Sequence, residues 1–224
     1  NILVGVDVTS NFPLEAKTLP SIGYIRNLSV EGILSLEPTL IIAENDIGPE
    51  HVVKQLKDAE MDLRIISAEY DLPGIIAKIG CVAEILNVDP METNILVNKL
   101  KKQFDALSAS TSKTDENRSS AVFILMMRGT EPIVAASNTS GSNFLQLAGF
   151  ENVFRETSGW TSAGKETLAS LNPDIIVLTK RAFRNFKNSD HFLSEIGIFT
   201  LPDYRNTIVH VDDGMAMLGF GPRT

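Results

Sequence analysis

Two segments of the chain follow the same plan, and this internal repeat constrains the fold more than any other feature. The segments read "EGILSLEPTLIIAE" in the first half and "KETLASLNPDIIVLT" in the second. In each, a glutamate (Glu31 or Glu166) precedes a proline (Pro38 or Pro173) by seven residues, with an apolar helical pattern between them and an apolar strand pattern after. The repeat predicts two lobes of similar build.

Strand and helix patterns alternate along both halves, which is typical of a parallel α/β architecture. A polar stretch, 108–120, marks a loop or domain junction between the halves. We therefore expect an α/β fold with two Rossmann-like lobes and a ligand cleft between the lobes. The expected strands are 2–7, 39–44, 62–68, 121–127, 132–136, 174–179 and 206–212, and the expected helices are 29–36, 49–59, 73–87, 90–110, 142–150 and 189–197.

Two helix starts carry specific signals. Ser29 or Asn27 can cap the helix that ends before Pro38, because their side chains accept hydrogen bonds from free backbone N–H groups. Pro49 begins the next helix, since its fixed φ suits the first turn.

Composition excludes several classes of function. The 224 residues include 20 Lys plus Arg against 28 Asp plus Glu, a net charge of -8, so no nucleic-acid partner is expected. No apolar run approaches the roughly 20 residues of a membrane span, so no membrane insertion is expected. The chain opens without a signal peptide, and we expect any export signal to have been removed. The single cysteine, Cys81, is interpreted as a buried inert thiol.

Charged residues follow the predicted strands at their carboxyl ends, where α/β folds bind ligands. The first lobe offers residues 44–46, "END". The second lobe offers Met127 and Arg128 after one strand, and Lys180 and Arg181 after another. This basic rim suits an anionic ligand.

Tyr24 and Arg26 form a Tyr-x-Arg pair in a predicted short loop. A loop tyrosine is usually only a half-buried amphipathic side chain. A cation two residues away favours the phenolate form, whose hard oxygen suits ferric iron. Arg26 could also pair with a carboxylate of a ligand. The pair thus indicates a candidate iron ligand.

Two other segments have competing interpretations. Trp160, the only tryptophan, lies in a Gly/Ser/Thr-rich loop and is either a core residue or an aromatic facing the cleft. The stretch 180–187, "KRAFRNFK", is either a solvated helix face or a set of ligand contacts, of which only Lys180 and Arg181 are near enough to the strand end.

Metal-site and enzyme patterns are weak. His51, His191 and His210 have no short ligand spacing, which argues against zinc. The motif G-x-S-x-G is absent, and no histidine stands in a recognisable order near "TSGSNF". We therefore expect a binding protein, not an enzyme; a tetrapyrrole-modifying enzyme or chelatase is the alternative from another class.

Three longer segments carry a resemblance to a known family: "VGVDVTSNFP", "LPSIGYIRNLSVEGILSLEPTLIIAENDIGP" and "LGFGPRT". They resemble the haem-uptake branch of the periplasmic substrate-binding proteins of ABC importers, and the resemblance covers essentially the whole chain. It begins at the family's second strand, so that a strand–helix unit before "VGVD" and a helix after "GPRT" lie outside this sequence.

The resemblance implies a domain organisation. Residues 1–88 form an N-terminal α/β lobe, 89–112 a long interdomain backbone helix, and 113–224 a C-terminal α/β lobe. It also implies a monomer in the periplasm that holds ferric haem b as the transported ligand and delivers it to permease subunits of an ABC importer.

The same resemblance assigns roles to residues. Tyr24 becomes the axial ligand of the haem iron, with Arg26 beside it, while Glu31 and Glu166 meet arginines of the permease. Contacts to haem are expected from Arg26, Arg128, Trp160, Lys180 and Arg181, with the cations pairing the propionates.

Some relatives ligate a second haem through a histidine after the strand 121–127, where this chain has Met126, Met127 and Arg128. We therefore expect one haem. The alternative ligand is a ferric siderophore or cobalamin, bound by other members of the same superfamily.

Overall fold

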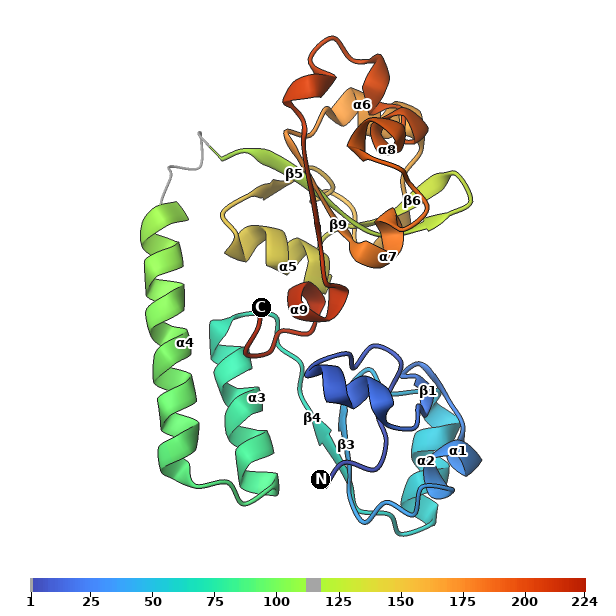
Figure 1. Ribbon diagram of the computed structural model, residues 1–224, viewed down its shortest axis with the longest axis vertical. Helices are drawn as coiled ribbons and strands as arrows, with labels where there is room; N and C mark the ends of the chain where they lie inside the picture. The colour runs from blue at the N-terminus through green and yellow to red at the C-terminus, as the bar shows by residue number, and fades with distance from the viewer. Residues whose placement is uncertain (1, 112–117) are drawn as a thin grey trace. The chain divides into compact units, whose positions relative to one another are not determined.

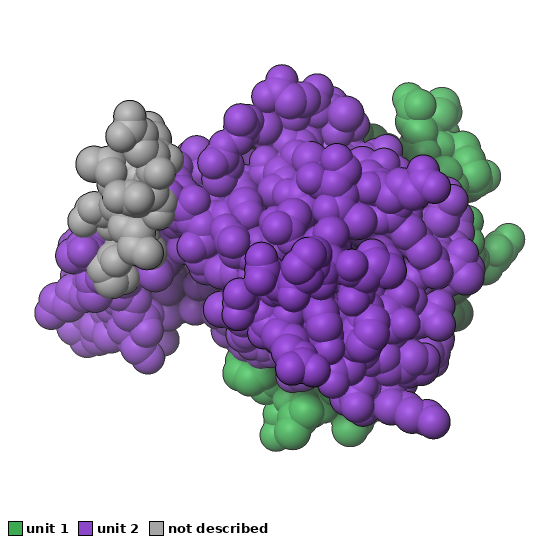
Figure 2. Space-filling view, turned by 90° about the horizontal axis from the view of Figure 1, so that it is seen from above, with its two compact units in different colours: residues 1–68 green, residues 69–224 purple. Residues whose placement is uncertain are grey.

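The computed structural model of the protein describes residues 2–111 and 118–224 (Figure 1). The chain divides into two compact units, residues 1–68 and 69–224, which we call unit 1 and unit 2 (Figure 2). The expected lobe boundaries at 88 and 113, and the expected cleft, stay predictions. Of the expected junction 108–120, residues 108–111 are helical, and residues 112–117 lie outside the described ones.

Both units mix helices and strands, which confirms the α/β class. Unit 1 contains η1 (Leu14–Thr18), β1 (Gly23–Tyr24), β2 (Asn27–Leu28), α1 (Val30–Leu34), β3 (Ile41–Glu44), α2 (Glu50–Asp58) and β4 (Leu63–Ile66). Unit 2 contains α3 (Leu72–Ile85), α4 (Pro90–Thr111), β5 (Ser120–Arg128), β6 (Glu131–Ala135), α5 (Ser140–Leu147), β7 (Glu151–Asn152), β8 (Trp160–Ser162), α6 (Lys165–Leu171), β9 (Ile175–Thr179), α7 (Lys180–Phe183), α8 (Ser189–Glu195), η3 (Ile198–Thr200), η4 (Tyr204–Asn206), β10 (Ile208–Asp212) and α9 (Gly214–Leu218).

Unit 1 is built on β3 and β4, which pair in parallel from Ile41–Leu63 to Glu44–Ile66. Ser29 caps α1 as predicted, because its Oγ accepts a hydrogen bond from the Gly32 N–H at 3.0 Å. The apolar sides of α1 and α2 then close a small core. Its buried members are Leu28, Ile33, Val52 and Leu56.

The expected strand at residues 2–7 is wrong for most of its length. Only Val6 forms a bridge, in parallel with Ser21, and Ile2 and Leu3 are 80% and 53% exposed. A strand needs a partner along its length to satisfy its backbone groups. Here the Val6 N–H donates to Pro20 O and the Ile22 N–H donates to Val6 O, while the Val8 N–H donates to Gly23 O.

Unit 2 is built on a mixed sheet in the order β10-β9-β5-β6-β8, with β7 also pairing β5. The pairs β10–β9, β9–β5 and β5–β7 are parallel, as expected, but β6 and β8 run antiparallel to their neighbours. The sheet of unit 2 is therefore mixed, with a parallel part at β10, β9, β5 and β7 and an antiparallel part at β6 and β8. Only Gly129 and Thr130 separate β5 from β6, and so short a connection allows only a hairpin; Gly129 has φ +63°.

The central strand β5 is buried on both faces, because successive side chains point to opposite sides. Val122 and Ile124 join one core cluster, and Ala121 and Phe123 join the other. The first cluster includes residues of α6, α7 and α8, and the second includes residues of α5 and α9. Figure 1 shows these helices on both sides of the sheet.

Helices α3 and α4 pack side by side in unit 2 (Figure 1). Their contact is centred on Ile75, Leu100 and Phe104, and Phe220 after α9 inserts into the same cluster with its side chain fully buried. At 22 residues, α4 is about 33 Å long. Within residues 2–111 and 118–224, no helix combines the length and the apolar character needed to cross a bilayer.

The repeat seen in the sequence has a structural counterpart in each unit. Glu31 is the second residue of α1 and Glu166 the second residue of α6, and a parallel strand follows each helix. The residues ahead of the two prolines, Glu37 and Asn172, both have positive φ, +48° and +42°. In both copies of the repeat, the residue before the proline therefore has a left-handed backbone conformation.

Candidate functional site

The Tyr-x-Arg pair lies at a tight turn. The predicted short loop is in part a β-hairpin: Tyr24 ends β1 and pairs with Asn27 of β2 in an antiparallel ladder, so that Ile25 and Arg26 form a two-residue turn. The Tyr24 side chain is 41% exposed. Arg26 Nη1 donates to Tyr24 Oη at 3.3 Å. The hairpin thus presents a phenol oxygen to solvent with a cation directly beside it.

Asp46 holds Arg26 from the other side. Arg26 Nη2 donates to Asp46 Oδ2 at 2.7 Å, and this ion pair joins residues 20 apart in the chain. Asp46 follows β3, where carboxyl-end residues of an α/β unit are expected to serve a site. In the sequence, only the place of Asp46 after a predicted strand indicates a site. Asp46 is not among the residues that the sequence analysis assigns to haem.

The backbone fixes this contact. Gly48 N–H donates to Ile25 O at 2.8 Å, and Leu28 N–H donates to Gly48 O at 3.1 Å. These two bonds tie the hairpin turn to the loop after β3. The approach of Asp46 to Arg26 is therefore set by the fold of unit 1 and not only by two flexible side chains.

The environment of Arg26 keeps it charged. Partial burial lowers the pKa of the guanidinium, but the hydrogen bond to Asp46, the charges of Tyr24 and Asp46 and the hydrogen bond to Tyr24 together raise the pKa above its ordinary value. Asp46 Oδ1, the carboxylate oxygen that does not face Arg26, is buried and has no hydrogen-bond partner within the described residues.

Three cations of unit 2 lie at one edge of its sheet. Arg128 is the last residue of β5, and Lys180 and Arg181 are the first residues of α7, directly after β9. Because β5 and β9 are parallel neighbours, their carboxyl ends lie at the same edge. All three side chains are exposed. The predicted basic rim therefore exists within unit 2.

Lys180 has a partner at this edge. Its Nζ lies 3.4 Å from Asp212 Oδ1 at the end of β10. The pKa of Asp212 is lowered chiefly because its carboxylate accepts a hydrogen bond from the Asp213 N–H at 2.6 Å; burial opposes this shift, and Lys180 and His210 add to it. Arg128 and Arg181 form no ion pair within the described residues.

Trp160 lies in an edge strand and not in a loop. It begins β8 and pairs with Ala135 of β6, so the Gly/Ser/Thr-rich segment is partly ordered by the sheet. Its half-buried indole packs edge-on against Phe123, with ring centroids 6.2 Å apart, and borders the cluster that contains Leu145. The core interpretation of Trp160 thus has direct structural support, and a haem contact stays a prediction.

Glu31 and Glu166 are both exposed in the first turns of short helices. Glu31 Oε2 accepts a hydrogen bond from the Oγ of Ser29, the residue that caps α1. A carboxylate here interacts favourably with the helix dipole. This favourable position leaves both carboxylates accessible.

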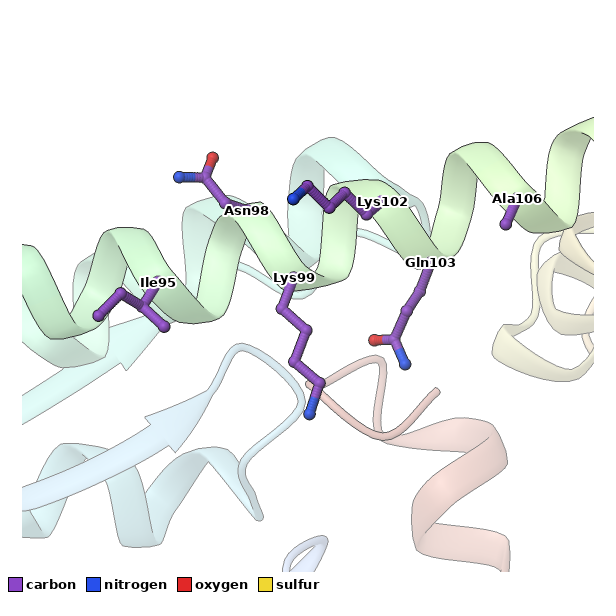
Figure 3. A pocket seen from close by; sticks show the side chains of 6 residues that line it. All are labelled: Ile95, Asn98, Lys99, Lys102, Gln103 and Ala106. Atoms are coloured by element: carbon purple, nitrogen blue, oxygen red, sulfur yellow. The ribbon is translucent and has the colours of Figure 1, made fainter.

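The pocket whose lining residues are drawn in Figure 3 does not coincide with these residues. Figure 3 shows side chains of α4 alone, spaced three and four apart along one face of that helix. A surface from one helix does not enclose a flat ligand. The residues that line the pocket are Ile95, Asn98, Lys99, Lys102, Gln103 and Ala106.

Within the described residues, no group of three His, Cys, Asp or Glu side chains is placed to hold a metal ion.

Comparison with known proteins identifies the family. The sequence profile of the periplasmic binding protein family matches residues 1–210, and the chain belongs to this family. Its members bind solutes, in agreement with the expectation of a binding protein.

Two solved structures resemble the chain closely. One is the periplasmic heme-binding protein BhuT in complex with two hemes: TM-score 0.88, 29% identity, 99% of this chain and 83% of that chain covered. The other is the periplasmic heme-binding protein RhuT from Roseiflexus sp. RS-1 in apo form: TM-score 0.88, 28% identity, 98% and 84% covered.

A vitamin B12-binding protein from Pectobacterium atrosepticum is 23% identical over 180 residues, which cover 79% of this chain and 63% of that protein. The chain spans 56% and 63% of the length of the first two curated relatives that it matches.

Proposed function

We propose that this protein captures ferric haem b in the periplasm and delivers it to the permease of an ABC importer. The observation that carries the proposal is the contact of Arg26 Nη1 with Tyr24 Oη at the exposed turn of unit 1. The likeness to two periplasmic haem-binding proteins, each covering nearly the whole chain, supports the choice of ligand.

Tyr24 supplies the iron ligand in this proposal. Ferric iron prefers a hard, anionic oxygen, which a phenolate supplies, and the guanidinium of Arg26 lies directly beside the oxygen of Tyr24. The phenol oxygen is already at a solvent-exposed turn, so that haem can reach it without unfolding of the hairpin.

The propionates are paired by cations of unit 2. Arg128 and Arg181 are the main candidates because they are exposed and form no ion pair within the described residues, whereas Lys180 is shared with Asp212. A guanidinium binds a carboxylate through two parallel hydrogen bonds. Arg26 also remains a candidate for a propionate, because its bonds to Tyr24 and Asp46 use only two of the five N–H donors of a guanidinium.

Delivery uses Glu31 and Glu166. Each projects from the first turn of a short helix in its own unit, and the two helices are the equivalent elements of the repeat. Two equivalent carboxylates suit a permease that presents arginines to both lobes. Docking through exposed charges does not require any change in the haem-binding residues.

The second candidate ligand is cobalamin, favoured by the likeness to vitamin B12-binding proteins. The test is a competition experiment in which the protein is equilibrated with ferric haem and challenged with cyanocobalamin in excess. Retention of haem, with a spectrum of phenolate-ligated ferric iron, supports the proposal. Displacement of haem by cobalamin overturns it in favour of the alternative.

A further inference from the structure

Asp46 lies outside the predicted set of ligand contacts, yet it is bonded to the residue that contacts Tyr24. Arg26 bridges the two: one terminal nitrogen bonds Asp46 at 2.7 Å and the other bonds Tyr24 at 3.3 Å. The shorter bond is to the carboxylate, and charge-assisted bonds of this kind are the stronger ones. The orientation of the guanidinium is therefore governed by Asp46.

Stability alone does not account for Asp46. Its partner Arg26 is half exposed, and an exposed ion pair adds little to the stability of a fold. The second carboxylate oxygen is buried without a hydrogen-bond partner among the described residues, and such an oxygen lowers stability. An alanine would remove that cost.

We propose that Asp46 is a positioning residue for iron ligation: it fixes Arg26 so that Nη1 points at the oxygen of Tyr24. The rigid loop supports this role, because the bonds between Gly48 and the residues Ile25 and Leu28 hold Asp46 against the turn. The inference rests on the proposed function, since it concerns the same phenolate.

The mechanism acts on the electron density of the phenolate. A hydrogen bond from a guanidinium draws electron density away from the oxygen that would bind iron. Without Asp46 the long Arg26 side chain samples other rotamers and the hydrogen bond is lost for part of the time. The oxygen then carries more electron density, and charge transfer from phenolate to iron requires less energy.

The experiment adds ferric haem to the full chain and to variants at Asp46. We expect Asp46→Ala to move the phenolate-to-iron charge-transfer band to longer wavelength and to raise the haem dissociation constant on the order of 10-fold. Asp46→Asn, which keeps the shape and a neutral acceptor, should fall between the wild type and Asp46→Ala. Asp58→Ala removes the carboxylate of another ion pair in unit 1, Lys54–Asp58, and should change neither quantity.

A double substitution tests whether Asp46 acts through Arg26. In an Arg26→Gln background, adding Asp46→Ala should change neither the band nor the affinity further. An unshifted band in both Asp46 variants, or a full additional effect in the Arg26→Gln background, would overturn the positioning role.

The failures of the two proposals are distinguishable by Tyr24→Phe. If Tyr24→Phe keeps the wild-type haem spectrum, Tyr24 is not the ligand and both proposals fall. If Tyr24→Phe loses the spectrum while both Asp46 variants keep it, the haem assignment stands and the role of Asp46 alone is rejected.

Discussion

Arg26 donates to the phenol oxygen of Tyr24 across a two-residue turn, with 3.3 Å between the two atoms. The chain contains a second tyrosine–arginine contact, in which Arg205 Nε donates to Tyr204 Oη at 3.2 Å. The two pairs differ in their surroundings. Tyr204 stacks on Phe199 with ring centroids 4.4 Å apart, whereas Tyr24 stands at an exposed turn beside a fixed ion pair.

Tyr24→Phe should remove most haem affinity, because phenylalanine keeps the ring and loses the oxygen that binds iron. We expect the dissociation constant to rise by at least about 100-fold, the upper end of what changes outside the ligand shell produce. An absorbance titration measures the loss. Tyr204→Phe is the matched control, since it removes a hydroxyl from the other tyrosine–arginine pair and should bind haem as the wild type does.

Arg128→Gln should weaken the binding of haem but not of its dimethyl ester. The arginine is exposed and has no ion-pair partner within the described residues, so its charge is available to a propionate. Lys180→Gln should have a smaller effect because Lys180 already pairs with Asp212. Equal losses for haem and for the ester would show that propionate pairing is not the reason.

Glu31→Arg and Glu166→Arg should each block haem uptake in cells while leaving haem affinity unchanged. Reversing the charge opposes docking onto arginines of a permease. Glu50→Arg is the control in unit 1, because Glu50 is also a first-turn glutamate, in α2. Uptake at the wild-type rate in both variants would remove the docking role from these residues.

The stability of unit 2 should depend on Asp212 at neutral pH. The pKa of this carboxyl is lowered from 3.8 in the folded protein, first of all by the hydrogen bond from the Asp213 N–H. A lowered folded-state pKa gives stability that is present above the unfolded value and is lost as the pH falls through the folded value. Asp212→Asn should therefore lower the free energy of unfolding at pH 7, and its effect should be smaller at pH 3.

Chemical denaturation at the two pH values measures the effect of Asp212→Asn. Asp58→Asn, at an exposed ion pair on α2, is the control and should show a smaller difference between the two pH values. A loss of stability that is the same at both pH values would contradict the role assigned to the Asp212 charge.

Trp160→Ala should lower the free energy of unfolding by about 3 kcal/mol, because the indole packs on Phe123 at the edge of the core. The predicted contact with haem adds weaker haem binding to this effect. Trp160→Phe keeps an aromatic ring and should retain most of both properties. Lower stability with unchanged haem affinity would assign Trp160 to the core alone.

Local patterns predicted most of the secondary structure. The cap at Ser29, the helix start at Pro49 and the apolar runs of β3, β5 and β9 depend on short-range chemistry, which a sequence displays directly. Residues 2–7 have an equally good strand pattern, but a strand also needs a neighbour, and that is a long-range property. The antiparallel direction of β6 follows from the short turn at Gly129. The apolar pattern of a strand does not by itself indicate the direction in which the strand runs.

In the candidate site, too, short-range contacts could be predicted and long-range contacts could not. Tyr24 and Arg26 are two residues apart, so their contact could be expected from the sequence. Asp46 reaches Arg26 only because the loop after β3 is bonded to the hairpin through Gly48, and no local pattern predicts that approach. Trp160 was expected in a loop because glycine and serine surround it, yet pairing with Ala135 places it in a strand.

The most direct measurement is an absorbance titration of the purified protein with ferric haem, followed through the Soret band and the visible charge-transfer region. We predict saturation at one equivalent with a high-spin spectrum typical of phenolate-ligated ferric iron. Absence of a specific spectrum would contradict the haem assignment, and two equivalents bound with comparable affinity would contradict the expectation of a single haem.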